Sequence, residues 1–305
     1  MKMPAKLKLI IILFLIADAI ALAGYWRTCQ KESGTTAGES TRSMPGFAPE
    51  EFPNFDEQLF FTSLKRAADK KEALKAGIIP HHQLAGELIS DFFGRIDPQK
   101  AQRVIILSPN HFESGNTEAI ISDSSFPTPF GRLEPDSEAV KSITIPGLAE
   151  TDNKVIKGEP GIQALLPYVK FYLPDAKIVP VIFSRNISVG QLKTIERRLK
   201  PVADDPGTIL VASVDFAHYG TCDEAVSRDA VTRGILERRD PESLFNLTNR
   251  FLDSPASVFL AYRLFEGSHD PVLVRRTDGC ELLGQRDSNV TSYFEIIFYP
   301  VRQVP

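Results

Sequence analysis

Short β-branched runs alternate with amphipathic segments along most of this 305-residue chain. The pattern predicts strands at residues 76–80, 103–107, 118–122, 176–183, 208–214, 272–276 and 290–299. It predicts helices at residues 83–95, 135–142, 160–173, 189–199, 225–237, 241–249 and 257–265. Such alternation is typical of a single α/β domain with a central, mostly parallel or mixed sheet covered by helices. Pro180 lacks a backbone N–H, so residues 176–183 are expected to form an edge strand or to contain a bulge.

The first 26 residues differ from the rest of the chain, because three lysines precede a long apolar run. This pattern predicts a signal peptide or an N-terminal membrane anchor at residues 1–26. Residues 27–54 are small, polar and punctuated by Gly and Pro, as in a flexible tether, and residues 55–305 form the expected domain. We therefore expect a location in the cell envelope, inner-membrane anchored or periplasmic. A net charge of −4 does not indicate the positively charged surface that nucleic-acid-binding proteins use.

The three cysteines, Cys29, Cys222 and Cys280, are too few and odd in number for a complete disulfide framework. A bond between Cys222 and Cys280 is possible in an exported chain, but their spacing does not determine it. We expect two separate thiols instead.

Three of the five histidines come just after hydrophobic runs. The motifs are Ile79-Pro80-His81-His82, Ser108-Pro109-Asn110-His111 and Val214-Asp215-Phe216-Ala217-His218-Tyr219. Sites in open α/β sheets form beyond the carboxyl ends of strands, where a histidine serves as a metal ligand or a general base. The alternative is three unrelated histidines that only follow strands. The repeated placement favours a shared site.

Adjacent residues on extended chain point to opposite sides, so one of His81 and His82 is expected to face the crevice, and we favour His81. Asp215 precedes His218 by three residues and could orient its imidazole or bind a metal, or it could simply cap a helix.

Phe216 and Tyr219 would form an apolar wall of this crevice or pack in the core. The fifth histidine, His269, lies in Gly267-Ser268-His269-Asp270-Pro271, which resembles a surface turn.

Two histidines and a carboxylate with open coordination positions suit non-haem Fe(II), and other ligand sets suit zinc or copper. The residue types alone do not determine which of these metals is bound. The chain contains no Gly-x-Ser-x-Gly nucleophile motif and no glycine-rich phosphate loop.

Several motifs together resemble one known family, the MEMO family, whose prokaryotic members are called AmmeMemoRadiSam system protein B. The motifs are Ile-Pro-His-His, Leu-Ser-Pro-Asn-His, Phe-Pro-Thr-Pro-Phe-Gly, Leu-Leu-Pro-Tyr, Ile-Val-Pro-Val and Val-Asp-Phe-Ala-His-Tyr-Gly, in this order over residues 76–299. The family is similar in fold to class III extradiol dioxygenases. The resemblance implies an open α/β sheet with a metal-binding crevice.

The resemblance implies that His81 and His111 occupy metal-binding positions and that His218, with Asp215, acts as an acid/base group. Two motifs depart from the family pattern. Residues 159–163 read Glu-Pro-Gly-Ile-Gln where the family often has Glu-His-Ser-Ile-Glu, and residues 251–255 read Phe-Leu-Asp-Ser-Pro where it often has Cys-Gly before Pro. Asp253 could replace that cysteine as an oxygen ligand if the backbone brings it to the site.

The resulting expectation is an exported or membrane-tethered MEMO-like protein with a divalent-metal crevice for Fe(II), Cu or Zn and redox or oxygenase-like chemistry. One alternative is a binding or scaffold protein without turnover, and another is a metal-dependent hydrolase of a small envelope substrate. The expected partners are an unknown small molecule and, if residues 1–26 stay attached, the membrane. The resemblance also implies radical SAM and AMMECR-type partners, but these fit poorly with an exported domain.

Overall fold

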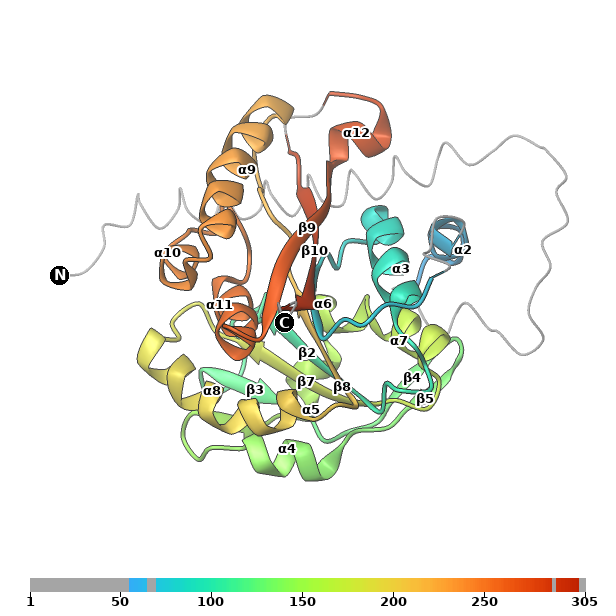
Figure 1. The fold of residues 1–305 in the computed structure, drawn as a ribbon, viewed down its shortest axis with the longest axis vertical. Helices are drawn as coiled ribbons and strands as arrows, with labels where there is room; N and C mark the ends of the chain where they lie inside the picture. The colour runs from blue at the N-terminus through green and yellow to red at the C-terminus, as the bar shows by residue number, and fades with distance from the viewer. Residues whose placement is uncertain (1–54, 65–69, 287–288, 302–305) are drawn as a thin grey trace, which may run out of the picture. The chain divides into compact units, whose positions relative to one another are not determined.

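The computed structural model describes residues 55–64, 70–286 and 289–301 (Figure 1). These residues belong to one compact unit, Ala48–Pro305. They form an α/β domain with a mixed sheet between helices, which confirms the predicted fold class. The predicted signal or anchor at residues 1–26, the predicted tether at 27–54 and Cys29 lie outside the described residues.

The main sheet has eight strands in the order β6-β3-β7-β2-β8-β1-β10-β9. Its four central strands, β7, β2, β8 and β1, are parallel, whereas β3 and β10 run antiparallel to their inner neighbours. A separate hairpin pairs β4 with β5. The bounds are β1 Ala76–Ile79, β2 Arg103–Pro109, β3 Ala119–Ile121, β4 Phe126–Thr128, β5 Gly131–Leu133, β6 Ala149–Thr151, β7 Lys177–Phe183, β8 Thr208–Ser213, β9 His269–Asp278 and β10 Ser292–Pro300.

Helices cover both faces of this sheet, as Figure 1 shows. One face packs against α4 Ser137–Ile143, α8 Val189–Asp204, the end of α9 Cys222–Glu237, α10 Pro241–Phe245 and α11 Pro255–Phe265. The other packs against α2 Glu57–Ser63, α3 Gly86–Arg95, α5 Asn153–Lys157, α6 Pro160–Gln163 and α7 Leu166–Tyr172. A short 3₁₀ helix, η3 Gln83–Ala85, precedes α3, and α12 Gly279–Leu283 follows β9. Central strands buried on both faces explain why they appear in the sequence as continuous apolar runs.

Gly77 in β1 lets α3 pack closely on the sheet. A Cβ atom at this position would come within 2.2 Å of the Phe92 ring. The close approach therefore requires glycine here.

The prediction of an edge strand or bulge at Pro180 is wrong. β7 lies inside the sheet between β3 and β2, and its pairing with β2 is continuous. The N–H of Lys177 bonds toward β2 and that of Ile178 bonds away from it, so the missing N–H of Pro180 would point away from β2 as well. β3 pairs only as far as Val181, so Pro180 lies just beyond the end of β3. The missing donor therefore costs the sheet no ladder hydrogen bond.

Three further predictions on local structure need correction. The helix expected at residues 160–173 is divided into α6 and α7, because Pro167 cannot donate the hydrogen bond that would continue α6. The helix expected at residues 241–249 ends at Phe245. His269 is not in a turn but begins β9, where its ring lies 5.3 Å from that of Phe265.

The expectation of two separate thiols is also wrong, because Cys222 and Cys280 form a disulfide. Val290 pairs with Gly220 in an isolated bridge, which brings the segment after α12 beside the start of α9. The two Cα atoms are consequently 6.2 Å apart, within the range that a disulfide spans.

The predicted cell-envelope location is corrected as well. Among the residues that the structure describes, no helix combines the length and apolar character needed to cross a bilayer.

Candidate metal centre

The three histidine motifs converge because of the strand order. β2, β8 and β1 are adjacent and parallel, so the residues that follow them meet at one edge of the sheet. His81 follows β1, His111 follows β2, and Asp215 follows β8. Asp253 reaches the same edge from the loop before α11, where its N–H donates to the Asp215 carbonyl at 3.1 Å.

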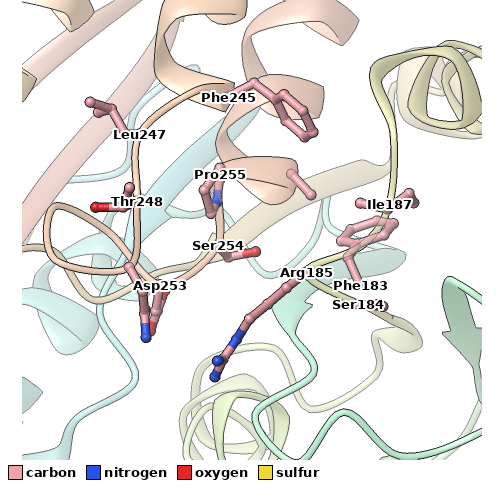
Figure 2. Close-up of a pocket in the computed structure, with 12 residues that line it drawn as sticks. Phe183, Ser184, Arg185, Ile187, Phe245, Leu247, Thr248, Asp253, Ser254 and Pro255 are labelled. Atoms are coloured by element: carbon pink, nitrogen blue, oxygen red, sulfur yellow. The ribbon is translucent and has the colours of Figure 1, made fainter. Parts of the chain in front are cut away.

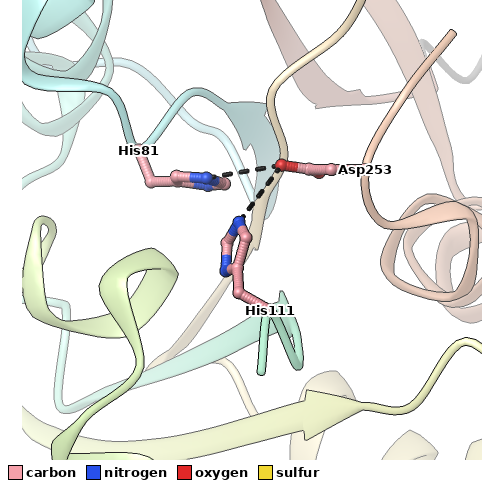
Figure 3. Close-up of side chains that lie close together, drawn as sticks. All are labelled: His81, His111 and Asp253. Atoms are coloured by element: carbon pink, nitrogen blue, oxygen red, sulfur yellow. Dashed lines mark ion pairs between the residues drawn. The ribbon is translucent and has the colours of Figure 1, made fainter. Parts of the chain in front are cut away.

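His81, His111 and Asp253 point toward one another, as Figure 3 shows. Nε2 of His81 lies 3.3 Å and Nε2 of His111 3.8 Å from Oδ2 of Asp253. The three potential ligand atoms lie within 4.8 Å of one another. Donors about 2.1 Å from one metal ion lie at most about 4.2 Å apart. Small movements of the side chains would let all three reach one ion.

The far nitrogen of the His81 ring is held by β8. Nδ1 of His81 lies 3.1 Å from Oγ of Ser213, and this hydroxyl donates to the Gly161 carbonyl at 2.6 Å. Because the hydroxyl hydrogen is already used, Ser213 accepts the hydrogen of Nδ1. The neutral ring then presents the Nε2 lone pair to Asp253.

Glu159 holds the His111 ring in the same way. Its side chain is 1 % exposed, accepts from the His111 backbone N–H at 3.0 Å and makes a short contact with His111 Nδ1. It also accepts from the Gly161 N–H at 3.1 Å as the N-cap of α6. A carboxylate behind a ligating histidine fixes the tautomer and strengthens the ligand. The role of Glu159 went unrecognised in the sequence, although Pro160 directly after it is a helix-start signal.

Burial sets the protonation of the centre. It lowers the pKa of His81 and brings the pKa of His218 down to about 4, so both rings are neutral at neutral pH. Burial, together with the negative charge of Asp215, raises the pKa of Asp253 well above its usual value. The centre thus gathers imidazole lone pairs and carboxylate oxygens without a fixed cation beside them in the described chain. This donor set fits a divalent metal ion.

Asp215 and His218 lie beside this group without bonding each other. Oδ1 of Asp215 accepts from the His81 backbone N–H at 3.1 Å, and Oδ2 lies 3.7 Å from His81 Nε2. Ligand atoms of Asp215, His218 and Asp253 also lie within 4.8 Å of one another. Nδ1 of His218 is buried and has no hydrogen-bond partner among the described residues. Asp215 is not a helix cap, because Thr221 caps α9.

Of the remaining crevice candidates, Tyr219 lies beside the site, with its ring centroid 5.5 Å from that of His218. His82 caps η3 by accepting from the Leu84 N–H at 3.3 Å, and it belongs to neither ligand group. Phe216 is fully buried and stacks on Phe294 with ring centroids 4.2 Å apart, so it is a core residue. Tyr219 is 65 % exposed, with a φ of 57° directly after His218.

The model of the family described as Memo-like protein matches residues 48–290. The chain belongs to the Memo-like protein family. A MEMO1 family protein of Pyrobaculum aerophilum is 26% identical over 239 residues, covering 75% of this chain and 84% of the relative. One of Nitrosopumilus maritimus is 28% identical over 238 residues, covering 74% and 85%. An uncharacterized protein from Escherichia coli K12 has a TM-score of 0.46 at 12% identity, covering 72% of this chain and 99% of that one.

Membership in the Memo-like family confirms the resemblance stated from the motifs. The two segments that depart from the family pattern both reach the centre. The first supplies Glu159 behind His111, and the second supplies Asp253 opposite the two histidines. The altered segments therefore retain polar groups that face the site.

Proposed function

We propose that this Memo-like family protein binds one divalent metal ion, Fe(II), through His81, His111 and Asp253 and performs oxygenase-like redox chemistry on a small molecule. The observation that carries the proposal is the convergence of two imidazole Nε2 atoms on Oδ2 of Asp253. Two histidines and one carboxylate with open positions are the ligand set of non-haem Fe(II) oxygenases. When bound, such an ion supplies Lewis acidity and electron transfer.

The chain's own residues would orient the ligands and handle a proton. Ser213 and Glu159 hold the far sides of the two ligating rings. His218 is neutral at neutral pH, and its free, buried Nδ1 can accept a proton. The negative charge of Asp215 stabilises the protonated form, as its upward effect on the His218 pKa indicates. This pair is our candidate general base.

The metal site is tested by metal analysis of the full chain after loading with Fe(II) without oxygen and removal of unbound ion. We expect about one equivalent in the wild type and almost none in a His81→Ala/His111→Ala double variant. His82→Ala is the matched control, because His82 is adjacent but outside the ligand group, and it should retain the metal. Equal metal content in the wild type and the double variant would contradict the proposal.

The redox part is tested separately by oxygen uptake of the Fe(II)-loaded chain, with catechols and a catechol that carries a carboxylate as probes. Uptake above that of the chelator-treated chain is expected, with a loss in His218→Ala of about 100-fold or more. Iron that stays bound without any oxygen uptake would contradict the oxygenase activity and leave the metal site standing.

A further inference from the structure

A cavity of about 290 Å³ adjoins the candidate metal centre (Figure 2). One wall is the end of β7 and the loop that follows it, and the other is the segment from the end of α10 to the start of α11. Asp253 is shared, because it lines the cavity and also faces His81 and His111. A molecule in the cavity would therefore lie directly beside the proposed metal ligands. The volume lies at the small end of the range for ligand pockets.

The lining mixes apolar and polar side chains and contains one cation. Four large apolar side chains contribute to it, namely Phe183, Ile187, Phe245 and Leu247. Arg185 is the only basic residue among the lining residues. In Figure 2 the ends of Arg185 and Asp253 lie at one end of the cavity, away from Phe245 and Leu247. The charged groups therefore lie together at one end of the cavity, and Phe245 and Leu247 lie away from them.

Arg185 is positioned by the loop that carries His111. The Arg185 backbone N–H and the Ser184 hydroxyl donate to the Glu113 carboxylate at 3.1 and 3.0 Å, and Arg185 Nε lies 3.5 Å from Glu113 Oε1. Glu113 has a φ of 47°, an uncommon conformation that these contacts hold in place. Both Nη atoms of Arg185 lack a partner among the described residues, and the side chain is 61 % exposed. A guanidinium in this state can bind an incoming carboxylate through two parallel hydrogen bonds.

We propose that the cavity binds a small monocarboxylate with a compact apolar group as the substrate of the metal centre. The apolar group occupies the end lined by Phe245 and Leu247, and the carboxylate pairs with Arg185. This inference rests on the proposed function and specifies its substrate class. Because ion pairs at exposed positions are weak, the apolar group supplies most of the affinity and Arg185 selects the charge.

The test uses calorimetric titration of the full chain loaded with Zn²⁺, which has no redox chemistry. Benzoate is the probe. Acetate is the control that has the carboxylate but lacks the apolar ring, and benzyl alcohol is the control that has the ring but no charge. We expect benzoate to bind at least about ten-fold more tightly than acetate and about five-fold more tightly than benzyl alcohol. Arg185→Gln should weaken benzoate about five-fold and leave benzyl alcohol unchanged, with partial recovery in Arg185→Lys. Arg198→Gln, at an exposed position on α8, is the matched control.

Equal affinities for benzoate and benzyl alcohol, or an unchanged benzoate affinity in Arg185→Gln, would overturn the inference. Equal affinities for acetate and benzoate would also overturn it, because the carboxylate would then bind without the cavity. Failure of Zn²⁺ itself to bind would overturn the proposed function. Benzoate is therefore also titrated into the metal-free chain, where binding that depends on Arg185 supports the cavity independently of the metal.

Discussion

Two buried carboxyl groups, that of Asp253 at the edge of the sheet and that of Glu295 within it, have very different surroundings. Asp253 lies at the carboxyl edge of the sheet, with two imidazole nitrogens facing it and a cavity beside it. Glu295 is fully buried in β10, and burial with the nearby charge of Asp91 raises its pKa to about 9. As a carboxylate, Glu295 accepts no hydrogen bond from the described residues, and the side chain beside it is the carboxylate of Asp91. A perturbed pKa therefore does not identify a site by itself, whereas converging lone pairs beside a cavity do.

The strongest test of this contrast is Asp253→Asn. The amide removes the negatively charged ligand, so we expect metal affinity to fall by about 100-fold or more. Without metal, the variant should be at least as stable as the wild type, because a buried carboxyl beside Asp215 is lost. Competition against a chelator measures the affinity, and thermal unfolding in the chelator measures the stability. Unchanged affinity would show that Asp253 is no more a ligand than Glu295 is.

Glu159→Gln tests the support behind His111. The amide cannot hold the His111 ring as a carboxylate does, so we expect metal affinity to fall about 10- to 100-fold with the fold retained. The matched control is Glu113→Gln, which alters a carboxylate two residues beyond His111 that touches no ligand ring. Equal losses of metal affinity in the two variants would mean that any lost carboxylate near His111 weakens binding. The contact between Glu159 and the His111 ring would then not be the cause.

The smallest effect on metal affinity is expected for Glu295→Gln, which instead changes how stability depends on pH. The folded chain keeps a proton on Glu295 up to about pH 9, whereas the unfolded chain releases it near the ordinary value. This contribution to stability is fully present below the unfolded pKa and is lost as pH rises toward the folded pKa. Between about pH 5 and pH 9 the wild type should lose on the order of 1 kcal/mol per pH unit relative to the variant. Denaturant unfolding at several pH values measures this, and parallel pH profiles would contradict it.

The fold class could be predicted from the sequence, and so could the meeting of the strand-end residues at one edge of the sheet. Parallel strands end at the same edge, so histidines placed after them converge once β1, β8 and β2 are neighbours. That rule locates His81, His111 and Asp215, because each directly follows a strand.

Asp253 and Glu159 follow no strand of the sheet, so the same rule does not locate them. Asp253 is brought in by a hydrogen bond from its N–H to the Asp215 carbonyl, and Glu159 by the break between α5 and α6. Both depend on contacts between segments distant in sequence. The errors at Pro180 and at the two cysteines have the same origin, since the short β3 and the Val290–Gly220 bridge decide them.

The disulfide between Cys222 and Cys280 encloses the part of the chain that carries Asp253. Cys222 and Cys280 are 58 positions apart, and the loop they close contains Asp253 and one wall of the cavity but neither His81 nor His111. Closing a loop of that length lowers the entropy of the unfolded chain by an amount worth about 4 kcal/mol. A protease cut between α9 and α10 would open this loop without releasing a fragment until the bond is reduced. The two halves of the metal centre thus belong to separate parts of the chain, one of which is a covalent ring.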